Sequence, residues 1–406
     1  MTKAIAYPKL HVPAGEDFLL LSPTAQAYAY RNVDRMFATR KISRGDRVLE
    51  LQRGAEISPR YEADGLMLGV DGYIDRANVA GLLVIREDRI VLERYALGLQ
   101  EDARWSSMSM IKSLTSTLVG AALQAGAISS LDDAVSKYIP ALRGCAYDAV
   151  TVRNLVTMSS GVRWNEDYTD RNSDVNRYSK SLGDRSPGGV LALMRSLKAE
   201  HVPGSRFNYN TGDTYVLGCL ISAATGKTLA GYMSETIWSR LGMEFDAFYT
   251  LESEDGQEIG GSRAGISLRD LGRFGVFLLR NGVIDNVPVL SSDWIENAGR
   301  ASFDLDPQAN RYGAVGYGYS WWIDSDESMV AVGFAGQSLY VNRKAGVIIV
   351  TLSCQPQPPF SASYTVDLKA EQRAFKDAVL AELNSVVRPE EPRECLKPSA
   401  PSSPCR

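Results

Sequence analysis

The sequence contains only two histidines, His11 and His201, among 406 residues. A Ser-His-Asp or Cys-His catalytic unit needs one well-placed imidazole, and catalytic zinc sites typically need two or three. His201 directly precedes Val202-Pro203 and stays open as a candidate base. We expect the base of an enzyme with so few histidines to be another residue type, and we expect neither a metal nor a cofactor.

Cysteines and long apolar runs are also scarce. The five cysteines are scattered and form no Cys-x-x-Cys pair, which argues against a disulfide framework or a zinc site and favours a reducing compartment. The only apolar run near the start, Phe18 to Leu21, is far shorter than a secretory signal core, and nothing approaches the roughly 18 apolar residues of a membrane span. We therefore expect a cytoplasmic protein with no membrane partner.

Positive charge is not in excess. The chain has 44 Lys+Arg against 48 Asp+Glu, so its net charge of −4 gives no reason to expect nucleic acid. Gly-x-Ser-x-Gly, Gly-x-Gly-x-x-Gly and P-loop motifs do not occur, which argues against the α/β-hydrolase, dinucleotide and nucleotide classes. With 45% hydrophobic residues the chain is an ordinary globular protein, and its expected partner is a small molecule. The sequence leaves the oligomeric state open, and a homodimer is compatible with it.

Strand patterns lie near both ends of the chain. Residues 82–85 and 90–92 flank a polar turn and predict a hairpin, and residues 329–334, 338–342 and 347–352 predict further strands before a helix over 366–383. The middle of the chain has mostly helical spacing. We predict an α+β fold in which N- and C-terminal segments share one antiparallel sheet flanked by helices, with an inserted, mainly helical domain.

These patterns divide the chain into four parts. Residues 1–75 form an extension that packs on the catalytic unit, residues 76–150 and 290–387 form the sheet domain, residues 151–289 form the helical domain, and residues 388–406 form a disordered tail. Within the helical domain, residues 163–188 have almost no apolar content and predict a long loop. Such loops are typically lids or binding loops, and a loose surface excursion is the alternative.

The first candidate for chemistry is the Ser-x-x-Lys pattern formed by Ser109 and Lys112, in which the lysine lies one helical turn later on the same face and takes the serine's proton. About one such match is expected by chance in this composition. The context adds weight, because an apolar helical stripe begins at Ser109 and a helix start favours an alkoxide. Burial beside Ile111 and Leu114 would lower the pKa of Lys112, whereas an exposed lysine on an ordinary helix is the alternative.

The second candidate is Tyr209, which follows the turn Pro203-Gly204 and precedes a helix over 215–225. A tyrosine held beside a lysine can relay protons, since a nearby cation favours its phenolate. Taken alone, an aromatic residue in this position is more often part of the core.

Taken together, these features carry a family resemblance. The chain resembles the serine β-lactamase and penicillin-binding superfamily, specifically the class C-like esterases and 6-aminohexanoate-dimer (nylon oligomer) hydrolases, from about Gly81 to the final helix. The stretches that carry the resemblance are 104–112, 130–133, 138–140, 153–155, 160–162, 203–217, 272–275 and 317–322.

The resemblance implies a β-lactamase/transpeptidase-like fold and a role for particular residues. It makes Ser109 the nucleophile and makes Lys112 and Tyr209 the proton-transfer pair. The backbone N–H groups of Ser109 and Gln337 are expected to form the oxyanion hole. Tyr168 resembles a substrate-contacting tyrosine of the linear-amide hydrolases, and Trp322 is interpreted as cleft wall or core.

Two positions depart from the family pattern. Thr211 stands where the family commonly has an asparagine, which puts that substrate contact in doubt. Phe334-Ala335-Gly336 stands where the third motif has Lys or His, a small residue and Gly, so the cation that meets a β-lactam carboxylate is missing there. This absence predicts a preference for uncharged acyl chains.

The resulting hypothesis is a serine hydrolase that cleaves small carboxylic esters or linear amides through an acyl-enzyme. A weak β-lactamase or D-amino-acid peptidase is the alternative among enzymes. A catalytically silent binding protein on the same fold is the alternative from another class.

Overall fold

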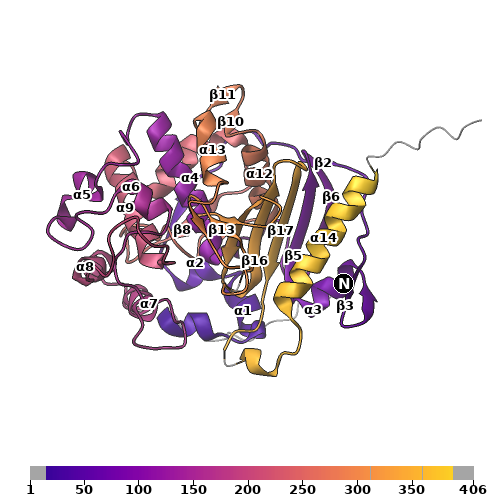
Figure 1. Cartoon of the computed structure of the whole chain (residues 1–406). Coiled ribbons are helices and arrows are strands. Elements are labelled where there is room, and N and C mark those ends of the chain that lie inside the picture. The colour runs from indigo at the N-terminus through magenta and orange to yellow at the C-terminus, as the bar shows by residue number, and fades with distance from the viewer. Residues whose placement is uncertain (1–14, 311, 359, 387–406) are drawn as a thin grey trace, which may run out of the picture.

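The computed structural model describes residues 15–310, 312–358 and 360–386, and in this part of the chain nine strands form the main sheet (Figure 1). Neighbouring strands are antiparallel, with one exception. At one edge of the sheet, β2 (Gln52–Arg53) runs parallel to its neighbour β6 (Arg89–Tyr95). In spatial order the strands are β12 (Phe303–Asp304), β13 (Gly316–Tyr317), β14 (Trp322–Ile323), β15 (Met329–Gly333), β16 (Gln337–Asn342), β17 (Val347–Ser353), β5 (Val79–Arg86), β6 (Arg89–Tyr95) and β2 (Gln52–Arg53).

The early and the late strands of the main sheet meet where β17 pairs with β5. The register runs from Val347 opposite Arg86 to Ser353 opposite Val79. Hydrogen bonds between strands so distant in sequence confirm the prediction of one antiparallel sheet built from N- and C-terminal segments. The predicted hairpin at 82–92 is β5 and β6, and the three predicted late strands are β15, β16 and β17.

Helices cover both faces of this sheet, with α14 on one face and α4 and α12 on the other (Figure 1). Successive residues of β17 point to opposite faces. Ile348 and Val350 join the core around α4 and α12, whereas Ile349 packs with Phe375 and Val379 of α14. Burial on both faces explains why β5 and β17 are nearly continuous apolar runs.

Between the two strand regions the chain is mostly helical, as predicted. The helices of the described residues are α1 (Pro23–Ala29), α2 (Val33–Met36), α3 (Val70–Arg76), α4 (Ile111–Gln124), α5 (Val135–Tyr138), α6 (Val152–Val156), α7 (Asp174–Asp184), α8 (Gly189–Ser196), α9 (Thr211–Thr225), α10 (Leu229–Met233), α11 (Ser239–Leu241), α12 (Leu268–Leu279), α13 (Ser292–Ala298) and α14 (Leu368–Val386). None of them combines the length and the apolar character that a membrane crossing needs.

The remaining strands form smaller units. They are a four-stranded sheet of β1 (Thr39–Ile42), β8 (Ala247–Thr250), β9 (Gly265–Ile266) and β7 (Trp105–Ser106), and two hairpins, β3 (Tyr61–Ala63) with β4 (Leu66–Leu68) and β10 (Val283–Ile284) with β11 (Val287–Pro288). In the four-stranded sheet, β7 leads directly to Ser109 and pairs with β9. The division into domains stays a prediction, and the predicted tail 388–406 lies outside the described residues.

The stretch 163–188 differs from the predicted loop because it contains α7. Ser173 caps this helix, since its Oγ accepts from the N–H of Asn176 at 3.3 Å. Val175, Tyr178 and Leu182 are buried at helical spacing on one face. The surrounding polar and charged residues mask this narrow stripe in the sequence.

Candidate active site

Ser109 and Lys112 are in direct contact. Ser109 lies in a 3₁₀ turn, η2 (Met108–Met110), immediately before α4, which carries Lys112 in its first turn. Lys112 is only 2% exposed, and its Nζ donates to Ser109 Oγ at 2.9 Å and to the carbonyl of Gly261 at 2.7 Å. The predicted pairing of a serine with a buried lysine three residues later is therefore present in the structure.

The turn that presents Ser109 is held from both sides. Met108 has a positive φ of 46°, a conformation that costs an ordinary residue about 1–2 kcal/mol. The N–H of Ser107 donates to the carbonyl of Ala264 at 2.7 Å, and the side chain of Ser107 donates to the carbonyl of Met108 at 3.1 Å. Backbone strain supported by such neighbours is a common property of functional sites.

Tyr209 is placed beside this pair by aromatic packing. Its ring stacks on Trp322 at 5.6 Å, meets Tyr317 edge-on at 6.4 Å, and lies 5.2 Å from Lys112 Nζ. Burial, followed by the nearby phenols of Tyr312 and Tyr317, raises the pKa of Tyr209 well above its usual value. Desolvation therefore favours the neutral hydroxyl of Tyr209 in this state, and the proton-transfer role of Tyr209 beside Lys112 stays a prediction.

Glu166 connects the predicted Tyr168 and Thr211. Its carboxylate accepts from the hydroxyl of Tyr168 at 2.8 Å, from Oγ1 of Thr211 at 2.5 Å, from the N–H of Thr211 at 3.2 Å and from Nε1 of Trp164. The N–H of Thr211 belongs to the first turn of α9, where a negative charge is favoured. Sequence reasoning missed Glu166, whose signal is an acidic residue between two aromatic residues in an otherwise polar stretch.

Phe334 and Gly336 form the turn between β15 and β16, and Gln337 begins β16. The side chain of Gln337 is fully buried; its Oε1 accepts from Nε1 of Trp105 at 2.9 Å and from the N–H of Ser353 at 3.0 Å, while its Nε2 donates to the carbonyl of Phe334 at 3.0 Å. A Cβ at Gly336, which has φ +87°, would lie 2.4 Å from the side chain of Gln355. The side chains of Gln337 and Gln355 therefore hold this turn in place.

Ser109 lines a small cavity of about 20 Å³, close to the size of one water. Tyr168, Thr211 and Phe334, which were predicted for the site, line it as well, and the rings of Tyr168 and Phe334 touch at a centroid distance of 4.9 Å. Arg263 is the one charged side chain among the described lining residues. Arg263 could not be predicted from the sequence, because the local stretch Gly260-Gly261-Ser262-Arg263 has no pattern that marks a buried arginine.

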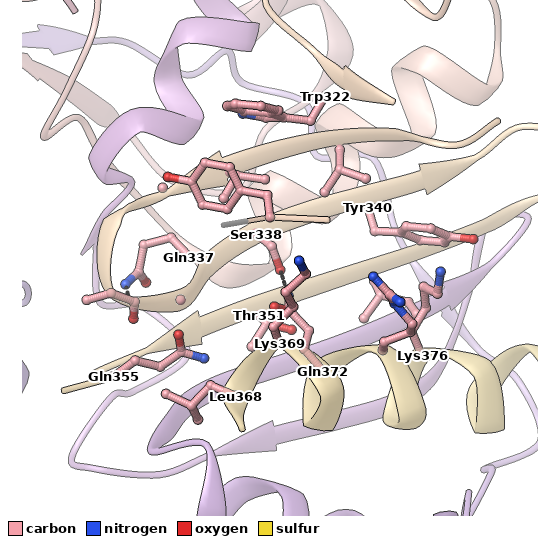
Figure 2. Close-up of a pocket in the computed structure, with 18 of the residues that line it drawn as sticks. Trp322, Gln337, Ser338, Tyr340, Thr351, Gln355, Leu368, Lys369, Gln372 and Lys376 are labelled. Carbon is pink, nitrogen blue, oxygen red and sulfur yellow. Dashed lines mark hydrogen bonds between the residues drawn. The ribbon is translucent and has the colours of Figure 1, made fainter. Parts of the chain in front are cut away.

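A larger cavity of about 320 Å³ lies between the sheet and α14 (Figure 2). Trp322, Phe334, Gly336 and Gln337 line it, so it contains four of the predicted site residues, whereas Ser109 and the proton-transfer pair do not line it. Phe334 borders both cavities.

In residues 15–386, leaving aside 311 and 359, no group of three or more His, Cys, Asp and Glu side chains could hold a metal ion. His201 lies 3.8 Å from Glu200 and outside the lining of the Ser109 cavity.

Comparison with known proteins assigns a family. The model of the beta-lactamase family matches residues 70–374. The chain belongs to the beta-lactamase family. This confirms the resemblance found in the sequence, and the chain is accordingly a serine hydrolase with the fold of that family.

Individual relatives agree with the assignment. The 6-aminohexanoate-dimer hydrolase of Paenarthrobacter ureafaciens is 28% identical over 345 residues, which are 82% of this chain and 86% of the relative. A solved "putative 6-aminohexanoate-dimer hydrolase" from Bacillus anthracis has a TM-score of 0.79 at 22% identity, covering 94% of this chain and 99% of that one. A family VIII carboxylesterase has a TM-score of 0.55 at 15% identity, covering 73% and 91%. The two structural likenesses concern the fold.

Proposed function

We propose that this beta-lactamase-family protein cleaves small carboxylic esters or linear amides through an acyl-enzyme on Ser109. The observation that carries the proposal is the 2.9 Å contact between Lys112 Nζ and Ser109 Oγ, with the lysine buried. Burial favours the neutral amine, which can accept the hydroxyl proton across the same contact.

During acylation, the proton of Ser109 passes through Lys112 and Tyr209 to the leaving group. Ser109 Oγ attacks the carbonyl carbon while its proton passes to Lys112 Nζ. The tetrahedral intermediate collapses by breaking the bond to the leaving alcohol or amine, which takes the proton of the Tyr209 hydroxyl, and Lys112 returns its proton to Tyr209. Water attacks the acyl-enzyme by the same route in reverse and restores the Ser109 hydroxyl.

The oxyanion needs two backbone donors. The N–H of Ser109 is one, and the sequence predicts Gln337 as the other. Gln337 begins β16 directly after the turn 334–336, and its side chain supports that turn by donating to the carbonyl of Phe334. We keep the N–H of Gln337 as the proposed second donor.

The substrate class rests on the site and on relatives together. The third-motif turn carries Phe334 in place of a cation, which does not favour β-lactams with their carboxylate. The relative from Paenarthrobacter ureafaciens is named for hydrolysis of 6-aminohexanoate dimer, and a structural neighbour is named a carboxylesterase. Both names agree with a small acyl substrate that is not a lactam.

A fluorophosphonate probe and a substrate panel test the proposal. We expect the probe to label the wild-type protein and not Ser109→Ala, and we expect p-nitrophenyl esters or 6-aminohexanoate dimer to be turned over faster than nitrocefin. Ser113→Ala is the matched control, because Ser113 is a buried serine of the same helix that donates to the carbonyl of Ser320 at 2.6 Å. Wild-type protein without labelling or turnover would instead be a silent binding protein.

A further inference from the structure

Arg263 is a buried cation that lines the cavity of Ser109, and no acidic side chain among the described residues forms an ion pair with it. It is 2% exposed, and within the described residues its Nε and Nη1 have no hydrogen-bond partner, while Nη2 donates to Ser179 Oγ at a long 3.4 Å. A buried guanidinium normally has its donors satisfied, because desolvation of an unpaired charge is costly.

Another buried arginine of this protein shows the usual arrangement. Arg273 is also 2% exposed, and its Nη1 lies 3.0 Å from Asp270 and 2.9 Å from Glu244, while its Nε donates to the carbonyl of Leu49. No ion pair of this kind occurs for Arg263 among the described residues. The difference shows that the fold can pair a buried arginine, and that it does not do so at this cavity.

The surroundings of Arg263 hold it in place and supply more donors. Its guanidinium lies 5.2 Å from the ring of Phe18 and 5.3 Å from that of Phe37, and its backbone has a positive φ of 62°. Tyr178 and Ser262 line the same cavity, and their hydroxyls also lack a hydrogen-bond partner within the described part of the chain. Burial lowers the pKa of Arg263, yet an arginine remains protonated at neutral pH.

We propose that Arg263 binds a carboxylate on the acyl part of the substrate. The inference rests on the proposed acyl-enzyme at Ser109 and adds a preference, among its substrates, for esters or amides of short acids that end in a second carboxylate. A guanidinium offers the planar donors that a carboxylate accepts, and Arg263 lines the same cavity as Ser109, which favours a short chain between the reacting carbonyl and the carboxylate. A carboxylate site on the acyl side replaces the preference for uncharged acyl chains predicted from Phe334, and it restores no cation at the third motif.

Two methyl esters of equal chain length test the proposal. Monomethyl succinate and methyl butyrate differ only in a terminal carboxylate against a methyl group, and a pH-stat follows hydrolysis of both. We expect wild-type kcat/KM to be at least about tenfold higher for monomethyl succinate. In Arg263→Met the ratio should fall to about one or below. Arg300→Met is the control for net charge, because Arg300 is exposed and pairs only with Glu296 among the described residues, and its ratio should match wild type.

A binding measurement keeps the test independent of turnover. In Ser109→Ala, monomethyl succinate should raise the thermal midpoint and methyl butyrate should not, and the rise should disappear in Ser109→Ala/Arg263→Met. If the double variant fails to fold, the wild-type ratio and the shift in Ser109→Ala still decide.

Failure of this inference differs from failure of the proposed function. Equal rates for the two esters, with hydrolysis that still depends on Ser109, would overturn the role of Arg263 and leave the acyl-enzyme standing. Loss of fluorophosphonate labelling with a retained, Arg263-dependent thermal shift would instead overturn the acyl-enzyme and keep the carboxylate site.

Discussion

The two cavities that meet at Phe334 differ in how their polar walls are satisfied. In the larger one, Lys376 of α14 lies 2.7 Å from Asp324, and Gln372 donates to Ser338 at 3.1 Å (Figure 2). In the smaller one, Nε and Nη1 of Arg263 and the hydroxyls of Tyr178 and Ser262 have no hydrogen-bond partner among the described residues.

This difference teaches that volume is a poor guide to chemistry in this molecule. The larger cavity is about 320 Å³ and the smaller one about 20 Å³, yet Ser109 lines only the smaller one. A wall whose donors and acceptors are already paired gains little from a ligand, whereas unpaired buried donors are relieved by one. Within the described part of the chain, unpaired buried donors lie in the wall of the Ser109 cavity and not in the wall of the larger one.

Removing the base should give the largest effect on the catalytic side. Lys112→Ala should lower kcat/KM as much as Ser109→Ala, at least about a thousandfold, because the two act as one unit. The double variant should be no slower than either single one, measured with a p-nitrophenyl ester. A double variant well below both singles would mean that the two residues act independently.

Removing the hydroxyl group of Tyr209 should cause the second-largest loss of activity. Tyr209→Phe keeps the ring that stacks on Trp322 and should cost at least about a hundredfold in kcat, the usual scale for general acid–base help. Tyr317→Phe, which removes the hydroxyl of the ring edge-on to Tyr209, is the control and should cost far less. Near-wild-type activity of Tyr209→Phe would leave Lys112 as the sole proton carrier.

The buried carboxyl group of Asp213 should make the free energy of unfolding depend on pH. Burial raises the pKa of Asp213 from 3.8 to about 7. The folded state therefore holds a proton that the unfolded state has lost, and stability from this group falls as the pH rises from about 4 to 7. Asp213→Asn has no carboxyl group to titrate, so its free energy of unfolding should not show this decrease. Between pH 4 and 8 the difference in unfolding free energy between Asp213→Asn and wild type should shift by up to about 4 kcal/mol in favour of the variant, measured by urea titration. A difference independent of pH would show that Asp213 is charged throughout.

A substitution in the wall of the larger cavity should have the smallest effect on activity. Gln372→Leu removes one hydrogen bond from its wall, so we expect a loss of about 1 kcal/mol in unfolding free energy and unchanged kcat/KM. A marked fall in activity would mean that the larger cavity also takes part in catalysis, and the two cavities would then not differ in function.

The sequence was sufficient for features that depend on local spacing. The hairpin at 82–92, the late strands and the contact of Ser109 with Lys112 follow from patterns within a few residues, and the family motifs added Tyr209. Glu166 and Arg263 could not be predicted, because their significance depends on which segments pack around them. The helix α7 was missed since its three buried residues are outnumbered by polar ones. Cytoplasmic location, a homodimer and the domain boundaries stay predictions.

The side chain of Gln337 has a consequence for biosynthesis. It links Trp105 to Ser353, which is synthesised about 250 residues later, and it fixes the turn that includes Phe334. A nascent chain that already contains Ser109 and Lys112 cannot yet orient this turn. Hydrolysis should therefore begin only after β17 has left the ribosome, which makes catalytic activity a reporter of completed folding.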